Sequence, residues 1–310
     1  MALTNRVRML KDELLMTPKS ICTQRAVLIS ESYKETNDEH IYIIRARALE
    51  KILNNMDIYI RNNELIVGNQ ASKLNSAPVF PETGSNWVLE QLDYFETREM
   101  RKFLITDENK QILREVLPNW EDKTVLKKTI NMMNTETKDV YYQKYPVISP
   151  NLFIRGNVGH YVCNYEKVLQ IGFDGIKNDA LEKMDKLDNT WSNDCIDKRN
   201  FYKSVIIVCD AVVSFAYRYS QLAEEESKRE DIPLARKEEL IKISNICKKV
   251  PKQGATTFYE ALQSLWFTHL IIQIETDGLA ISLGRMDKYL FNFYENDINK
   301  IELQRLKHKN

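Results

Sequence analysis

Residues 258–274, FYEALQSLWFTHLIIQI, are the stretch that most constrains the fold of this chain. Apolar side chains recur there at helical spacing but cover more than one face, so we expect a helix that is buried on most sides. Thr257 and Glu260 have the spacing of a capping box, which predicts the start of this helix. From Glu275 to Arg285 the sequence changes to polar residues, glycine and arginine. The chain therefore places a buried helix directly before an irregular segment.

Helical periodicity runs through most of the remaining sequence. Only 9 glycines and 8 prolines occur in 310 residues, which favours long helices over a turn-rich β protein. Residues 58–68 differ, because two short β-favouring pieces flank an Asn-Asn turn and predict a small hairpin, or a strand that leads into a loop. Further helices are expected over residues 4–16, 21–33, 42–56, 87–101, 201–230 and 234–247, and irregular segments from Pro78 up to Trp87 and over 151–159.

Composition and charge exclude several classes of protein. Lysine plus arginine and aspartate plus glutamate each number 44, so the formal net charge is zero and a nucleic-acid partner is not indicated. Charges are spread through the first 16 residues, and no apolar run approaches the ~18 to 20 residues that span a bilayer. We therefore expect a cytoplasmic protein with no membrane role. Because no linker or internal repeat divides the sequence, we expect one domain over residues 1–310.

The sequence lacks the common catalytic and metal-binding motifs. Its five cysteines are far apart and form no Cys-x-x-Cys pair, so we interpret each as a small buried apolar side chain. The four histidines include no pair at metal-ligand spacing, and GxGxxG, GxxxxGK[ST], HExxH and GxSxG are all missing. General catalytic machinery is therefore not visible in the sequence.

His160 is the strongest single candidate for a binding residue. It follows Gly156-Asn157-Val158-Gly159, a glycine-rich approach along which backbone can come close to a ligand. The alternative is a structural histidine with satisfied hydrogen bonds. For His269, inside the buried helix, the structural interpretation is preferred, with a backbone carbonyl as the expected partner. Arg285 and Asp287 are expected to point the same way from a strand and to fix a turn.

Seven ordered motifs carry a resemblance to a known family, from about Arg6 to Tyr294. In order and spacing they resemble the N-terminal part of the glycyl radical enzymes, in particular the branch of B12-independent glycerol dehydratase and choline lyase. The resemblance implies a mainly α-helical N-terminal portion of an α/β barrel of the pyruvate formate-lyase type, with few short strands and an incomplete half-barrel. The motifs are Gln24-Arg25-Ala26, Glu31-Ser32-Tyr33-Lys34, Glu64-Leu65-Ile66-Val67-Gly68, Pro78-Val79-Phe80-Pro81-Glu82, Gly159-His160, Thr257-Phe258-Tyr259-Glu260-Ala261-Leu262-Gln263 and Gly284-Arg285-Met286-Asp287.

The resemblance also implies a radical chemistry whose reactive groups lie outside these residues. The family uses a glycyl radical, installed by a radical S-adenosylmethionine activating enzyme, which passes the radical to a cysteine. None of the nine glycines stands in an Arg-Val-x-Gly-Tyr frame, and none of the five cysteines is followed by Val-Glu. We therefore expect no catalytic residue, no metal site and no directly bound cofactor in this chain, which should be inactive alone.

Substrate-binding residues are implied by the same resemblance. His160 matches a histidine that hydrogen-bonds a substrate hydroxyl inside the barrel. Leu279, Ala280 and Ser282 belong to a first barrel strand that follows the buried helix and faces the substrate. Glycerol dehydratase carries a His-Ser pair where this chain has Leu279 and Ala280, so two partners for buried hydroxyls are replaced by aliphatic groups. A small substrate with an apolar portion therefore fits better than glycerol.

Two classes of function follow from these observations. In the first, the chain is the substrate-recognising part of a glycyl radical lyase or dehydratase of anaerobic metabolism, as a truncated product or one half of a split enzyme. Its partners would be the activating enzyme and a C-terminal complement. In the second, it is a non-catalytic helical protein or a remnant that associates with full-length relatives or with itself. An unrelated helical scaffold is a third alternative, which the strict order of the motifs disfavours.

Overall fold

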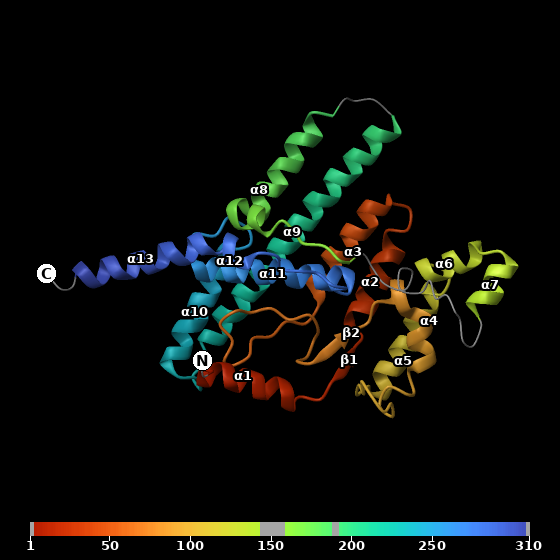
Figure 1. The fold of residues 1–310 in the computed structure, drawn as a ribbon, viewed down its shortest axis with the longest axis horizontal. Helices are drawn as coiled ribbons and strands as arrows, with labels where there is room; N and C mark the ends of the chain where they lie inside the picture. Colours follow the sequence, from red (N-terminus) through yellow and green to blue (C-terminus); the bar gives the residue numbers. More distant parts are fainter. Residues whose placement is uncertain (1–2, 143–158, 188–191, 308–310) are drawn as a thin grey trace.

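The computed structural model describes residues 3–142, 159–187 and 192–307, and within them the chain is mainly α-helical with two short strands (Figure 1). The first part contains α1 (Asn5–Met16), β1 (Ser20–Cys22), α2 (Gln24–Glu35), α3 (Ile41–Asn55), β2 (Ser76–Pro78), α4 (Pro81–Gln91), α5 (Asp107–Val116), the 3-10 helix η1 (Leu117–Trp120), α6 (Val125–Met132) and α7 (Thr135–Tyr141). The second part contains α8 (Tyr165–Asp185), α9 (Asn193–Ser227), α10 (Leu234–Lys249), α11 (Phe258–Thr276), α12 (Met286–Tyr289) and α13 (Phe291–Lys307). The predicted fold class is confirmed.

Most of the predicted helices form close to their expected bounds, and the differences have local causes. The helix expected over 201–230 begins earlier, at Asn193, because the Ser192 hydroxyl accepts a hydrogen bond from the Cys195 backbone N–H and caps the helix. The helix expected over 87–101 is α4, which starts earlier at a proline in its first turn and ends ten residues earlier. The helix expected to begin at residue 21 is α2, because β1 occupies the residues before it.

The hairpin predicted over residues 58–68 is wrong. This segment forms no paired strands, and the buried side chain of Gln263 holds it from α11. The Gln263 amide accepts from the Val67 N–H at 2.9 Å and donates to the Val67 carbonyl at 2.8 Å. One side chain thus supplies both backbone hydrogen bonds that a strand partner would have made. In the described residues the sheet consists of β1 and β2 alone, paired in parallel with Ser20 opposite Ser76.

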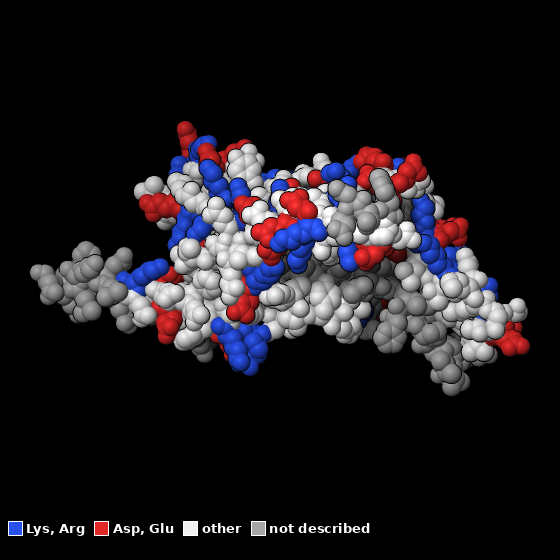
Figure 2. All heavy atoms as spheres, turned by 90° about the horizontal axis from the view of Figure 1, so that it is seen from above, with Lys and Arg blue, Asp and Glu red and all other residues white. Residues whose placement is uncertain are grey.

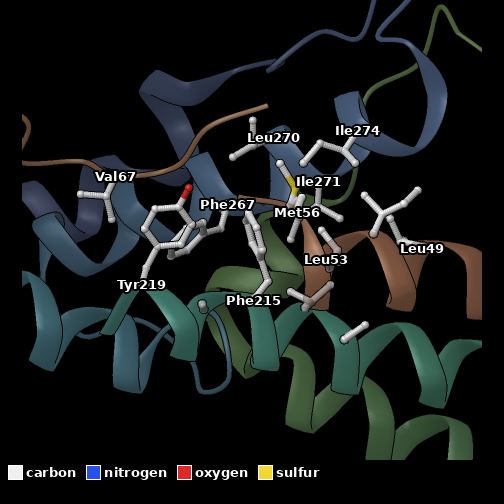
Figure 3. Close-up of a cluster of buried hydrophobic side chains, with 14 of the residues drawn as sticks. Leu49, Leu53, Met56, Val67, Phe215, Tyr219, Phe267, Leu270, Ile271 and Ile274 are labelled. Atoms are coloured by element: carbon white, nitrogen blue, oxygen red, sulfur yellow. The ribbon is translucent and has the colours of Figure 1, made fainter. Parts of the chain in front are cut away.

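The main hydrophobic core surrounds α11, as expected for a helix that is apolar on several faces. Ten of its 19 residues are buried, so the prediction of burial on most sides is confirmed. Phe267 lies against Phe215 and Tyr219 of α9, with ring centroids 6.0 and 5.5 Å apart. Figure 3 shows these rings meeting between the two helices, with Leu49 and Leu53 of α3 beside them. Burial of large aromatic side chains makes this cluster the main source of stability.

A second, smaller cluster lies where α4, α5 and η1 meet, and α2 connects it to the main core. Ala26 of α2 belongs to the smaller cluster, whereas Ile29, three residues later, belongs to the main one. Trp120 of η1 packs in the main core and donates its indole N–H to the Ser30 hydroxyl at 2.7 Å. The expectation of one domain over residues 1–310 stays a prediction.

Helix α9 is long and apolar enough, by length and composition, to cross a membrane. Its buried side chains, however, pack on α3, α8 and α10 in the manner of a core helix. α8 and α9 also run side by side as a projecting antiparallel pair (Figure 1). On the face shown in Figure 2 basic and acidic side chains are interspersed, in keeping with the zero net charge of the sequence.

Candidate functional site

Two segments that are far apart in sequence meet beside the C-terminal end of α11. The His160 N–H donates to the Leu279 carbonyl at 3.0 Å, and the Ser282 N–H donates to the Tyr161 carbonyl at 3.1 Å. Val162 and Ser282 form an isolated parallel bridge. These contacts place His160 beside the segment that contains Leu279, Ala280 and Ser282, so all four predicted binding residues lie in one place. Their contact with substrate stays a prediction.

Two glycines make this close pairing possible. A Cβ atom at Gly159 would lie 2.0 Å from the Leu279 carbonyl oxygen, so only glycine permits the approach of the two backbones. Gly278 has a φ of +75°, and a Cβ atom there would also meet the side-chain oxygen of Gln273. The sequence predicted that backbone near Gly159 comes close to a ligand. In the structure the backbone at Gly159 comes close to the chain's own Leu279 carbonyl. The preceding residues of that motif, 156–158, lie outside the described part of the chain, as does most of the irregular segment expected over 151–159.

Two of the four candidate residues have left-handed backbone. The φ angle is +59° at His160 and +53° at Ala280. Residues other than glycine seldom adopt this region, and each costs on the order of 1 kcal/mol or more. Such residues persist where their surroundings determine the conformation, and they concentrate at binding and catalytic sites. Because Asn75, Arg101 and Asp277 also have a positive φ, the backbone strain supports this site only together with the pairing of the two segments.

The side chains of the candidate residues are accessible in the described part of the molecule. Leu279 is 43% exposed, and His160, Ala280 and Ser282 are also exposed. The first barrel strand expected after the buried helix is reduced to the single bridge at Ser282, because left-handed residues on both sides of it interrupt the extended backbone. The Ser282 hydroxyl oxygen accepts from the Gly284 N–H at 3.0 Å, which leaves its O–H free to donate to a ligand.

The charged pair after this segment lies at the start of a helix and not on a strand as expected. Arg285 precedes α12, and its guanidinium contacts both carboxylate oxygens of Asp287 at 2.8 and 2.6 Å. This contact lowers the pKa of the Asp287 carboxyl to about 2. Both side chains are about two-thirds exposed, so the pair contributes little to stability. It closes the turn locally, and the strand expectation is wrong.

His269 lies in the body of α11 and has side-chain partners on both ring nitrogens. The Tyr165 hydroxyl is 2.9 Å from Nδ1, and the Gln273 amide nitrogen is 3.2 Å from Nε2. Burial lowers the pKa of the imidazole, and burial likewise raises the pKa of the Tyr165 hydroxyl. A neutral imidazole satisfies one partner as donor and the other as acceptor. The structural interpretation of this histidine is therefore supported, but the expected backbone carbonyl partner is wrong.

A cavity of about 610 Å³ lies between α3, α8, α9 and α11 and was not foreseen from the sequence. Tyr161 and Thr276 line it next to the candidate residues, and most of its other lining side chains are apolar. Arg45 and Glu275 form an ion pair at 2.5 Å in its wall. No sequence pattern signals this cavity, because its walls come from separate stretches of the chain. None of the four predicted site residues lines it.

The cysteines and possible metal ligands add no second site. Cys22, Cys209 and Cys247 are buried, as expected, whereas Cys163 and Cys195 are partly exposed, so the expectation of burial is wrong for these two. Burial raises the pKa of the Cys209 thiol to about 12, which keeps it protonated and unreactive at neutral pH. Over residues 3–142, 159–187 and 192–307 no cluster of three or more histidine, cysteine, aspartate or glutamate side chains is placed to hold a metal ion.

Comparison with known proteins gives consistent matches along nearly the whole chain. The model of the family described as pyruvate formate lyase-like matches residues 3–308. The probable dehydratase YbiW of Escherichia coli (strain K12) is 33% identical over 297 residues, which cover 96% of this chain and 36% of that protein. The (2S)-3-sulfopropanediol dehydratase of Klebsiella oxytoca is 32% identical over 302 residues, which cover 94% of this chain and 36% of that protein.

A solved structure shows the same arrangement of the chain. The glycerol-bound form of the B12-independent glycerol dehydratase from Clostridium butyricum superposes with a TM-score of 0.90 at 38% identity. The match covers 96% of this chain and 37% of that one. The chain therefore spans about a third of the length of the proteins it matches.

Proposed function

This chain belongs to the pyruvate formate lyase-like family, and on that premise we propose that it forms the substrate-recognising N-terminal part of a glycyl radical dehydratase or lyase. The substrate is a small polar organic molecule. The observation that carries this proposal is the backbone pairing of His160 with Leu279 and of Ser282 with Tyr161. This pairing gathers the candidate binding side chains, two of them on strained backbone, at the end of a rigid buried helix.

The residues of this chain bind and orient the substrate in this proposal. The His160 imidazole and the Ser282 O–H are the polar anchors for a hydroxyl or a similar group, while Leu279 and Ala280 form an apolar wall. When present, the glycyl radical supplies hydrogen abstraction through a cysteine. Both of those residues are placed outside these 310 residues, because no glycine or cysteine here stands in the family's sequence frames. The activating enzyme is the proposed partner that installs the radical.

Reconstitution tests this function directly. The chain is produced with a C-terminal complement that carries the cysteine and glycine loops, and is then incubated with the activating enzyme, S-adenosylmethionine and a reductant. We expect a glycyl radical doublet in electron paramagnetic resonance only when the complement is present, together with turnover of a small hydroxylated substrate. A doublet on the 310 residues alone would overturn this placement of the radical.

His160→Ala provides the residue-level test in the same preparation. Loss of one hydrogen bond to substrate, worth ~0.5 to 1.5 kcal/mol, weakens substrate binding ~2- to 13-fold. His40→Gln is the control, because the hydrogen bonds of the His40 ring are made to the Asp197 carboxylate and the Tyr42 N–H. Equal substrate affinity in both variants would remove His160 from the site.

Substrate selection depends on the apolar wall. Leu279→His with Ala280→Ser restores two partners for buried hydroxyls, so it should raise kcat/KM for glycerol and propane-1,2-diol relative to the natural substrate. The double variant leaves the backbone pairing in place, because only side chains change. If the relative kcat/KM for polyols stays the same, this segment does not face the substrate.

The non-catalytic alternative predicts the opposite outcome in the reconstitution. A helical protein that only associates with full-length relatives would form a complex with them but would support no turnover in any complemented preparation. Analytical ultracentrifugation of the same samples distinguishes the two outcomes, since it reports association independently of activity.

A further inference from the structure

The C-terminal end of α11 is held by a buried arginine from the opposite end of the chain. Arg25 of α2 donates its Nε–H to the Ile274 carbonyl at 2.7 Å and an Nη2–H to the Glu275 carbonyl at 3.4 Å. The last carbonyls of a helix have no partner within the helix. A cation at this end also complements the negative end of the helix dipole. The arginine, only 3% exposed, therefore acts as a cap on the last turn of α11.

Two residues of one sequence motif hold the arginine in place. The Glu82 carboxylate accepts from both terminal nitrogens of Arg25, at 3.0 and 2.5 Å. The Phe80 ring lies 3.7 Å from the guanidinium carbon on the face of the group. This bidentate and stacked geometry fixes the plane of the guanidinium as well as its position. Arg25, Phe80 and Glu82 stand in two motifs to which the proposed function assigns no role.

A second ion pair fixes the same helical turn from another side. Arg45 of α3 contacts the Glu275 carboxylate at 2.5 Å. The backbone carbonyl of Glu275 is thus bound by α2 and its side chain by α3. Beyond this turn, left-handed residues reverse the chain, and Leu279 pairs with His160 only five residues after Ile274. The direction in which α11 ends therefore determines where the candidate binding segment lies.

We propose that Arg25, held by Phe80 and Glu82, is the positioning residue of the candidate substrate site. By fixing the last turn of α11 it sets the place of residues 279–282 and, through their backbone bonds, of His160. That this site binds substrate rests on the proposed function, whereas the effect of Arg25 on the end of α11 does not. We name Arg25, Phe80 and Glu82 the α11 clamp.

The location of the clamp distinguishes positioning from general stabilisation. The body of α11 is already buried in the main core, where the Phe267 ring contacts two rings of α9 and Ile271 belongs to the same cluster as Leu53 of α3. A buried ion pair seldom adds net stability over apolar packing, because removing two charges from water is costly. The pair does fix the orientation of the groups that it joins, since its hydrogen bonds form only within a narrow range of distance and angle. Loss of the clamp should therefore loosen the end of α11 and leave its body in place.

Hydrogen–deuterium exchange on the protein that carries this chain tests the clamp. Arg25→Gln should speed exchange at the His160 and Ser282 amides about tenfold or more, because both amides are donors in the segment pairing. Amides in the middle of α11, such as that of Phe267, should keep their protection. Arg25→Lys should give an intermediate increase, since a lysine keeps the charge but not the planar fork.

Two further variants keep the test decisive. Glu82→Gln preserves the shape of the clamp and serves if Arg25→Gln does not fold, with a smaller but measurable rise in exchange at the same two amides. Arg114→Gln breaks an exposed arginine–aspartate pair that is not part of the clamp, in which Arg114 of α5 contacts both Asp93 oxygens at 2.8 and 2.9 Å, and it should change neither amide. Unchanged exchange in folded clamp variants would overturn the proposal, and so would an equal loss of protection along all of α11.

The same variants separate the clamp from the proposed function. Exchange is read without substrate, so an absence of turnover in the reconstituted enzyme counts against the function and leaves the clamp intact. In an active preparation, Arg25→Lys should raise KM more than it lowers kcat. If exchange is faster but KM is unaltered, the clamp is supported and residues 279–282 do not belong to the substrate site.

Discussion

Along its body α11 packs with apolar side chains of α3 and α9 (Figure 3), whereas its last turn is bound by charged side chains of α2 and α3. Apolar burial has no preferred direction and tolerates small shifts, while hydrogen bonds to carbonyl and carboxylate oxygens hold only in a narrow geometry. The body of α11 thus stabilises the fold, whereas its last turn fixes the position of the segment that follows it. The candidate site follows the last turn, where position matters.

The largest effect should come from the body of the helix. Phe267→Ala removes a fully buried ring from contact with two other rings, so it should lower the free energy of unfolding by ~3 to 5 kcal/mol. Tyr94→Ala is the control, because that side chain is 61% exposed and should cost little. Urea denaturation followed by circular dichroism measures both. Similar losses in the two variants would mean that α11 is not the centre of the core.

An intermediate effect is expected where the two segments meet. Gly159→Ala places a Cβ atom against the Leu279 carbonyl oxygen and should cost ~1 to 3 kcal/mol by forcing the backbones apart. Gly84→Ala is the matched control, since a Cβ atom there has open space around it and should change stability by less than ~0.5 kcal/mol. If the two substitutions have equal effects in thermal melts, the segments do not approach as closely as described.

A smaller effect on stability, opposite in sign to the two above, is expected at Ala280, which has a left-handed backbone. Ala280→Gly relieves a left-handed alanine but adds disorder to the unfolded chain, so it should be neutral or stabilising by up to ~1 kcal/mol. The same change at Ala261, which is fully buried in α11, should destabilise by ~1 kcal/mol or more. A destabilised Ala280→Gly variant would show that the alanine methyl group has packing contacts that the backbone strain does not outweigh.

The smallest effect concerns pH and the body of α11. Burial lowers the pKa of His269 below its ordinary value of 6.5, so the unfolded chain binds the proton first as the pH falls. The stability contributed by the neutral imidazole is full above about pH 6.5 and is lost as the pH falls through the lowered folded pKa. His269→Gln should flatten the pH dependence in this window. Parallel pH profiles for the two proteins would contradict the assignment.

Local patterns in the sequence were sufficient to predict α11 and the predominance of helices. Apolar spacing and Thr257 as N-cap predict a start that agrees with the helix at Phe258. In the capping box the Thr257 hydroxyl accepts from the Glu260 N–H as expected, but the Glu260 carboxylate turns to the Thr256 N–H. Helix caps and apolar periodicity depend on a few neighbouring residues, so they can be recognised without knowledge of the tertiary structure.

Contacts between distant residues could not be read in this way. The β-favouring residues of 58–68 suggested a hairpin, but the amide of Gln263, 196 residues after Val67, provides the hydrogen bonds. The family resemblance selected His160 and Leu279, which the structure places beside each other, and their role in substrate binding stays a prediction. Arg25 and Glu82 also lie in motifs of this family, but the sequence indicates no role for them, because the helix end that they hold forms only in the folded structure.

The bond from Arg25 to the Ile274 carbonyl also sets an order of events during synthesis, since 249 residues separate the two partners. At ~5 to 20 residues per second, the ribosome adds the carbonyl ~12 to 50 s after the arginine. Throughout that interval the guanidinium lacks its backbone partners on α11, and the place of His160 is undetermined even after His160 has been translated. The nascent chain therefore gains its substrate-facing geometry late, after the greater part of its helical framework has been translated.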